Sequence, residues 1–151
     1  MLSVGQPFPD FSLLNQDGVT VTNADLVGAP AVIYFYPKDD TTGCTAEACG
    51  FQERLPEIPG TKIFGVSPDA VKSHRKFADK YGLTFTLLAD TEQSLSMAAG
   101  VWAEKSMYGK TYMGVLRTTF VVDAHGIVQH IFEKVKPAGH ADEVKAVLAS
   151  L

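Results

Sequence analysis

The chain alternates between short apolar runs and longer stretches in which hydrophobic residues recur with a helical period. Continuous apolar runs are typical of strands buried on both faces of a sheet. A further strand, Ile127–Val135, follows a turn at Asp123-Ala124-His125-Gly126, and Asp17-Gly18 separates Phe11–Leu14 from Val19–Thr22 in a predicted N-terminal β-hairpin. The continuous runs are Ala31–Tyr36, Ile63–Val66, Phe85–Leu88 and Phe120–Val122.

Helical patterns fill the segments between these strands. Ser67-Pro68-Asp69 predicts an N-cap, a proline at the first helical position and an acid in the first turn, and Gly82 ends that helix. A short helix is expected around Gln93–Ala99. The buried stripes are Val71, His74, Phe77, Ala78 and Tyr81 in the first of these helices, and Val144, Val147, Leu148 and Leu151 near the C-terminus.

This order of elements predicts an α/β protein in which helices cross between the strands of one sheet. We expect a thioredoxin-like fold, with a central mixed β-sheet flanked by helices and an N-terminal β-hairpin. The pattern alone does not separate this fold from other mixed α/β folds. The length of 151 residues predicts a single domain, residues 1–151.

Composition and charge exclude several classes of protein. The net charge is −4 and the 13 Lys and Arg residues are scattered, so we expect no nucleic-acid partner. No apolar run reaches the about 18 residues of a membrane span, and Met1–Pro7 lacks the features of a signal peptide, so we expect no membrane association. Two cysteines do not make a disulfide scaffold and favour a cytoplasmic protein in which they are catalytic or redox-active.

Both cysteines lie in the segment that follows the most apolar strand. Cys44 is placed at or just inside the N-terminus of a helix whose buried face is Phe51, Leu55 and Ile58, and which Pro56 ends or kinks. Ligands of α/β proteins bind at this carboxyl end of the strands. The unpaired N–H groups and the helix dipole there favour a thiolate over a thiol.

Two other residues are candidates for the same site. Asp39 and Asp40 oppose a thiolate, so a cation from elsewhere in the chain is needed, and Arg117 precedes a strand that would bring it to the same sheet edge. Thr41 carries a hydroxyl that can donate to the sulfur or its substrate, or can simply cap the helix.

The spacing of the cysteines predicts a redox switch. On a helix, Cα atoms five residues apart are separated by roughly 8.6 Å, and a disulfide cannot span more than about 7 Å without backbone movement. A bond between Cys44 and Cys49 therefore requires that the first turns unwind. Gly50, which costs a helix about 1 kcal/mol relative to Ala, would ease this unwinding.

The segment YPKDDTTGCTAEACGFQ resembles the peroxidatic-cysteine segment of peroxiredoxins, whose signature Pro-x-x-x-Thr/Ser-x-x-Cys is matched by Pro37, Thr41 and Cys44. The second cysteine, Cys49, is similar to that of the bacterioferritin comigratory protein (BCP, PrxQ) subfamily. The resemblance extends along the chain, through Gly5–Phe11, Gly65–Ser67, Arg117–Asp123 and Gly139–Ala141.

The resemblance implies a thiol peroxidase without a cofactor or a metal. Cys44 would attack hydrogen peroxide or an organic hydroperoxide and become a sulfenic acid, and Cys49 would resolve it as an intrachain disulfide. Thioredoxin or a similar dithiol would reduce that disulfide. Thr41 and Arg117 would hydrogen-bond the sulfur and the peroxide oxygens, and Pro37 would shield the site from water. We expect a monomer.

The sequence departs from the subfamily at Thr42, where a proline is usual, and it ends Ala149-Ser150-Leu151 without a cysteine for an intersubunit disulfide. Two alternatives stay open. One is a disulfide oxidoreductase of the same fold, which the absence of Cys-x-x-Cys disfavours. The other is a peroxide sensor that passes its oxidation to a partner.

Five further expectations concern the rest of the chain. The histidines show no metal-ligand spacing with the cysteines, and the glycines around Gly109 form no nucleotide-binding pattern. Residues 104–114 read as a connection leading to Arg117, or as a rim that contacts substrate or reductant. Lys72–Lys80 reads as a solvated helix face. Three apolar residues near the site could admit alkyl hydroperoxides: Phe51, Trp102 and Met113.

Overall fold

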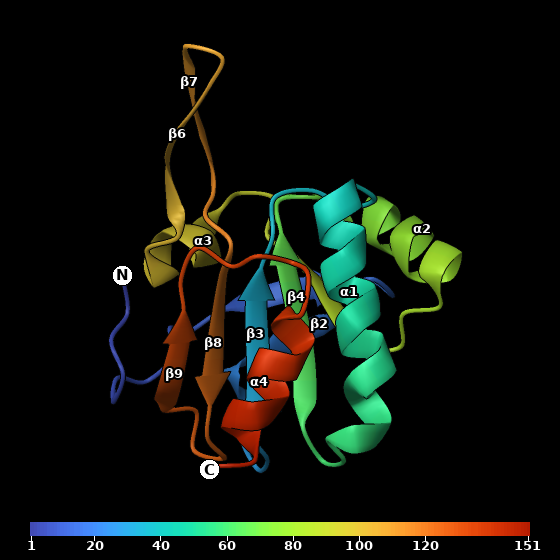
Figure 1. The fold of residues 1–151 in the computed structure, drawn as a ribbon, viewed down its shortest axis with the longest axis vertical. Helices are drawn as coiled ribbons and strands as arrows, with labels where there is room; N and C mark the ends of the chain where they lie inside the picture. The colour runs from blue at the N-terminus through green and yellow to red at the C-terminus, as the bar shows by residue number, and fades with distance from the viewer.

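The structure, a computed structural model, describes residues 1–151 and is built around a seven-stranded sheet with the order β2-β1-β5-β4-β3-β8-β9 (Figure 1). The strands are β1 (Ser12–Asn15), β2 (Thr20–Thr22), β3 (Ala31–Phe35), β4 (Lys62–Ser67), β5 (Thr86–Ala89), β6 (Trp102–Met107), β7 (Lys110–Val115), β8 (Thr118–Val122) and β9 (Val128–Phe132). The α-helices are α1 (Thr42–Arg54), α2 (Val71–Tyr81), α3 (Ser94–Ala99) and α4 (His140–Leu148), and short 3₁₀ turns cover Asn23–Asp25 and Leu55–Glu57. None of the helices is both long and apolar enough to cross a bilayer.

The sheet is mixed, as the sequence predicts. β3, β4 and β5 run parallel at its centre, while β8 pairs antiparallel with β3 and β9 antiparallel with β8. The predicted N-terminal hairpin forms from β1 and β2, and it joins the sheet because β1 also pairs with β5. The predicted thioredoxin-like fold class is confirmed.

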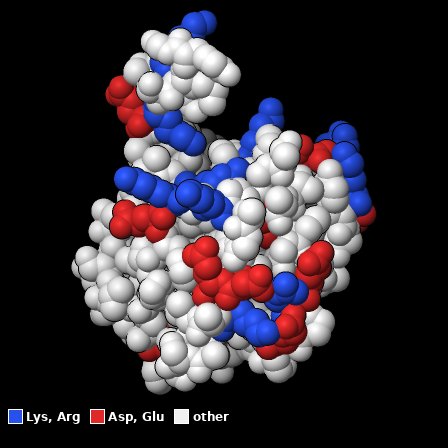
Figure 2. Space-filling model, viewed as in Figure 1, with Lys and Arg blue, Asp and Glu red and all other residues white.

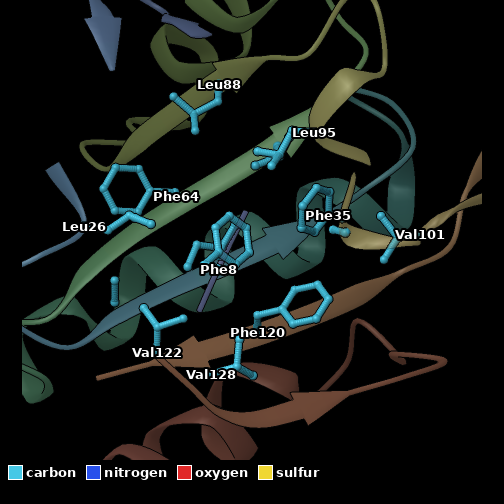
Figure 3. Packing of buried hydrophobic residues seen from close by; sticks show 14 of the residues in the cluster. Phe8, Leu26, Phe35, Phe64, Leu88, Leu95, Val101, Phe120, Val122 and Val128 are labelled. Atoms are coloured by element: carbon cyan, nitrogen blue, oxygen red, sulfur yellow. The ribbon is translucent and has the colours of Figure 1, made fainter. Parts of the chain in front are cut away.

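Each central strand is buried on both faces, which explains its continuous apolar sequence. In β3 successive side chains alternate between the two cores: Ile33 and Phe35 pack with α3 and the N-terminal segment, whereas Tyr34 packs with α1, α2 and α4. Figure 3 shows the first of these cores, in which Phe8, Phe35 and Phe120 lie between strands and loops. The second core includes Cys44 and Phe51, so the first turns of α1 are seated directly on the sheet.

Two boundaries differ from the sequence prediction. Helix α2 begins at Val71 with Ala70 as its N-cap, not at Ser67, which ends β4. Ser67 Oγ accepts from the Asp69 amide and donates to Asp69 Oδ2, and this carboxylate oxygen also accepts from the Asp39 amide, so Ser67 and Asp69 form a turn that binds the loop before α1 and the helix begins after it. The last predicted strand is shorter than expected, since β9 covers only Val128–Phe132.

The region predicted as a loop before Arg117 is instead a β-hairpin. β6 and β7 pair with Trp102 opposite Val115 and Met107 opposite Lys110, and the hairpin projects well beyond the main sheet (Figure 1). Tyr108 and Gly109 form the turn with φ values of 51° and 76°. A two-residue turn with both φ positive matches the twist of a hairpin, but a tyrosine is rarely found in it. The sequence therefore does not predict this turn.

Candidate active site

Cys44 lies at the N-terminal end of α1, in the place that the sequence predicts. Helix α1 begins at Thr42 with Thr41 as its N-cap, so Cys44 is its third residue. The segment Pro37–Thr41 connects the helix to the carboxyl end of β3. The Cys44 side chain is fully buried in the core between α1 and the sheet and forms no disulfide. The Cys44 sulfur is therefore surrounded by groups of the protein and not by solvent.

Arg117 is one of these groups. Because β3 and β8 pair antiparallel with Phe35 opposite Thr118, Arg117 lies beside the carboxyl end of β3. Its Nη2 donates to Cys44 Sγ over 3.0 Å, and its Nη1 donates to Glu47 Oε1 over 3.1 Å. A charge-assisted donor at this distance favours the thiolate form of a cysteine. The guanidinium is thus fixed by a carboxylate on one side and directed at the sulfur on the other.

Gly43 makes this approach of Arg117 feasible. A Cβ atom on Gly43 would lie 2.9 Å from Arg117 Nη2 and 3.3 Å from Pro137 Cγ. Real Cβ contacts are longer, so any larger residue would displace the guanidinium. The sequence does not predict this role of Gly43, because the glycine lies in a helix and nothing in the local pattern indicates a contact with a distant residue.

The other two residues of the predicted signature are half-buried and lie in the loop before α1. The Thr41 hydroxyl donates to the Lys38 carbonyl over 3.0 Å, and it makes no capping hydrogen bond to the helix. The structure does not join this hydroxyl to the Cys44 sulfur. Pro37 directly follows the buried Tyr36 at the end of the strand. The roles of Thr41 and Pro37 toward a substrate stay predictions.

Cys49 is half-buried on the same helix and is also a free thiol. Since α1 is continuous from Thr42 to Arg54, the two cysteines lie on successive turns of an intact helix and are not bonded. Burial, followed by the nearby Glu53 carboxylate, raises the pKa of the Cys49 thiol. In this conformation Cys49 is held as a thiol, away from the Cys44 sulfur.

The loop between β3 and α1 is fastened to α2 through Asp39, whose carboxylate is buried. Asp39 Oδ1 accepts from Tyr36 Oη over 2.6 Å, and Oδ2 accepts from Ser73 Oγ over 2.8 Å and lies 2.7 Å from His74 Nδ1. His74 Nε2 lies 3.0 Å from the Leu88 carbonyl, which can only accept, so Nε2 carries a proton. The 2.7 Å separation of His74 Nδ1 and Asp39 Oδ2 is that of a hydrogen bond, so the two buried side chains share a proton between them.

The sequence pattern predicts His74 on the buried face of its helix, where the structure has it, but does not predict its partner. A buried histidine needs polar partners, and Asp39 at the end of a buried strand is the available signal. Glu47 was missed as well. It lies on the same helix face as Cys44, Ala48 and Phe51, all of which are buried, and this spacing of three, four and seven residues was the available signal.

A shallow pocket of about 180 Å³ adjoins Arg117 at the foot of the β6–β7 hairpin. Lys105, Lys134 and Arg117 line it together with a single acid, Glu133. Figure 2 shows Lys and Arg side chains gathered between the hairpin and the body of the molecule, on a chain of net charge −4. A ligand in this pocket contacts the same guanidinium that binds the sulfur.

The predicted apolar surroundings of the site need correction. Phe51 is 1% exposed and its ring packs on Tyr34 and His140, so it belongs to the core and not to a substrate channel. Trp102 is half-buried against the other core, and Met113 is exposed on the hairpin.

Asp39, Asp69 and His74 are a group of metal-ligand side chains whose ligand atoms all lie within 4.8 Å of one another. Each of these atoms is already engaged: Asp69 Oδ2 accepts from Ser67 Oγ and the Asp39 amide, and His74 Nδ1 faces Asp39. A metal ion would have to displace these hydrogen bonds. The group is better explained as the fastening of the loop to α2.

Comparison with known proteins shows the family of the chain. Residues 4–131 match the AhpC/TSA family. The chain is 43% identical to a putative peroxiredoxin Bcp of Coxiella burnetii over 145 residues, which is 95% of this chain and 96% of that one. It is 41% identical to peroxiredoxin Bcp of Escherichia coli strain K12, covering 95% and 93% of the two chains.

Solved structures give the same result. The bacterioferritin comigratory protein of Xanthomonas campestris, studied for its alkyl peroxide reduction activity, superposes with a TM-score of 0.88 at 44% identity, covering 93% of this chain and 90% of that one. A cysteine-to-serine mutant of Xylella fastidiosa PrxQ superposes with a TM-score of 0.92 at 33% identity, covering 99% and 97%. The chain belongs to the AhpC/TSA family and, within it, to the Bcp (PrxQ) peroxiredoxins, enzymes that reduce peroxides at the expense of a thiol reductant.

Proposed function

We propose that the protein is a two-cysteine peroxiredoxin in which Cys44 is the peroxidatic cysteine and Cys49 the resolving cysteine. In the first step the Cys44 thiolate attacks the terminal oxygen of a hydroperoxide. The O–O bond breaks, Cys44 becomes a sulfenic acid, and the other oxygen leaves as an alkoxide that takes up a proton to give an alcohol or water. Sulfur is oxidised by two electrons and the peroxide is reduced by two.

The observation that carries this proposal is the 3.0 Å contact between Arg117 Nη2 and Cys44 Sγ. A guanidinium in this position favours the nucleophile and can stabilise the negative charge that develops on the departing oxygen. Thr41 would add a second donor if its hydroxyl turned from the Lys38 carbonyl toward the peroxide. Pro37 would limit access of water to the sulfur.

In the second step the Cys49 thiol attacks the Cys44 sulfenic acid. A disulfide forms and water leaves, so no further oxidant is needed. Because both cysteines lie on α1, the helix must first unwind between them. A dithiol such as thioredoxin then reduces the disulfide, which restores both thiols and oxidises the dithiol.

For the substrate we propose hydrogen peroxide and organic hydroperoxides, the latter supported by the alkyl peroxide reduction activity of the X. campestris relative. We further infer that the chain acts as a single domain, residues 1–151, and as a monomer in the cytoplasm. A reducing compartment would keep a dithiol donor available and both cysteines reduced between turnovers.

Multiple turnover tests the proposal. NADPH oxidation is followed in the presence of thioredoxin reductase, thioredoxin and either hydrogen peroxide or an alkyl hydroperoxide. Wild-type protein should cycle, Cys44→Ser should consume no peroxide, and Cys49→Ser should be oxidised once and then stop. A wild-type protein that stops after one equivalent would be a sensor. Reduction of insulin disulfides without peroxide turnover would instead indicate a disulfide oxidoreductase.

A further inference from the structure

Glu47 is a charged residue in an apolar place. It lies on α1 between the two cysteines, three residues after Cys44 and two before Cys49, and is only 2% exposed. Its Oε1 accepts from Arg117 Nη1 over 3.1 Å. Its Oε2 is also buried and has no hydrogen-bond partner. Only one of the two carboxylate oxygens is therefore compensated for the loss of water.

The buried Glu47 carboxylate with one unpartnered oxygen raises the free energy of the folded helix. A carboxylate can accept about four hydrogen bonds, and an oxygen buried without a donor keeps the cost of its desolvation. Tyr34 does not relieve it, since the Tyr34 hydroxyl is itself buried without a partner. The hydrogen bond from Arg117 to Glu47 Oε1 holds the guanidinium beside the Cys44 thiol. The unpartnered Oε2 has no such role in the intact helix.

We propose that Glu47 is a positioning residue for the disulfide-forming step: its half-satisfied burial destabilises the helical form of residues 43–50, so that α1 unwinds and Cys49 can reach Cys44. This inference rests on the proposed function in one respect, namely that unwinding of α1 serves to form the Cys44–Cys49 disulfide. Unwinding moves Glu47 off Arg117 and returns both of its oxygens to water. The free energy that the carboxylate costs in the helix is recovered in the conformation in which the two sulfurs can meet.

The effect depends on pH in a definite direction. Burial raises the pKa of Glu47 from 4.5 to about 7, against the opposing effect of Arg117. Below pH 4.5 the Glu47 carboxyl is protonated in both the folded and the unwound helix, and the helix has its full stability. As the pH rises toward 7 the unwound form loses its proton first, so unwinding becomes more favourable, and the effect levels off above 7.

Several other ionisable side chains face these turns of α1. Burial keeps the pKa of Tyr34 on β3 well above 10, and lowers that of His140 on α4 to about 4, so both are neutral near pH 7. Arg117 is charged throughout. At the far end of α1 the ion pairs are exposed and join Arg54 with Asp142, and Glu57 with Lys145. Burial, followed by the Glu53 carboxylate, raises the pKa of the Cys49 thiol. The Cys44 thiol lies one turn before Glu47 and is controlled by a serine variant.

Hydrogen exchange of the reduced protein tests the inference without any peroxide. Exchange of the amides of residues 43–50 is measured between about pH 5 and pH 8 and corrected for the intrinsic chemical rate, with the amides of α4 as an internal reference. In wild-type protein the opening of residues 43–50 should rise by roughly tenfold or more over this range. In Glu47→Gln the rise should be absent, and opening at pH 8 should fall below that of wild type.

Two further variants identify the group responsible. Glu47→Met removes both oxygens and should also abolish the rise, whereas Cys44→Ser should keep it. A wild-type opening that does not change with pH, or a rise that survives in both Glu47 variants, would overturn the inference. So would a rise that disappears in Cys44→Ser, because the thiol would then be its cause. None of these outcomes depends on peroxidase activity, so the proposed function stands or falls separately.

Discussion

Gly43 leaves the space that Arg117 occupies at the start of α1: a methyl group on Gly43 would lie 2.9 Å from Arg117 Nη2, the nitrogen that donates to the Cys44 sulfur. The position of the guanidinium is therefore set from two sides, by the carboxylate of Glu47 and by the missing side chain of Gly43.

The first prediction concerns this contact. Gly43→Ala should displace Arg117 from the sulfur and lower kcat/KM for peroxide by roughly tenfold to a hundredfold, because misplacement of a catalytic group by about 1 Å has effects of that order. The measurement is the second-order rate of Cys44 oxidation by stopped flow. Gly50→Ala is the matched control, since a Cβ there would lie at an ordinary 3.5 Å from Ala141 Cβ. Equal oxidation rates in both variants would argue against a role for the Gly43 contact.

The second prediction concerns Gly50 itself. Replacing this glycine by alanine stabilises a helix by about 1 kcal/mol, which should slow unwinding and hence disulfide formation by roughly fivefold. Oxidation of Cys44, which takes place in the intact helix, should keep its wild-type rate. Both phases can be followed in one experiment through the fluorescence of Trp102, the only tryptophan. The idea fails if the second phase is unchanged.

The third prediction concerns the pair Asp39 and His74, which fastens the loop before α1. Asp39→Asn and His74→Gln should each lower the free energy of unfolding, by about 1–3 kcal/mol for a change that leaves a buried polar group without its partner. The double variant should be more stable than the sum of the two losses predicts, by at least about 1 kcal/mol. Urea unfolding of the four proteins measures this coupling. Additive losses would mean that the two side chains do not stabilise each other.

The fourth prediction concerns His140, which is 1% exposed and has Nε2 2.7 Å from Thr119 Oγ1. Burial lowers its pKa from 6.5 to about 4, so the unfolded chain binds a proton before the folded protein does. Its contribution to stability should be present above pH 6.5 and should be lost as the pH falls toward 4. His140→Gln should therefore lose less stability between pH 7 and pH 4.5 than wild type, by about 2 kcal/mol. Urea unfolding at the two pH values checks this, and equal losses would contradict it.

The sequence predicts the central fold well because the physics of that region is local and repetitive. The run Ala31–Tyr36 can only be a strand that is covered on both faces, and His74, Phe77 and Ala78 repeat at a helical spacing that matches their burial. The position of Cys44 follows from the same logic, since the helix must start where the strand ends.

What the sequence does not predict depends on contacts between distant segments. The start of α2 moves to Val71 because Ser67 and Asp69 are engaged with each other and with the loop at Asp39. The β6–β7 hairpin forms around Tyr108, whose positive φ no propensity suggests. Gly43 matters only because Arg117, 74 residues away in the chain, approaches it. Glu47 looks like an ordinary acid near a helix start until the arginine and the core are placed around it.

The central claim, that Cys44 and Cys49 act as a peroxidatic and resolving pair on one helix, is tested most directly by intact mass under non-reducing conditions. Reduced protein is treated with one equivalent of hydrogen peroxide, and part of it is digested. The account predicts a monomer lighter by two hydrogen atoms and a peptide cross-linked between Cys44 and Cys49. A stable product that is heavier by one oxygen at Cys44, or a protein of unchanged mass, would contradict it.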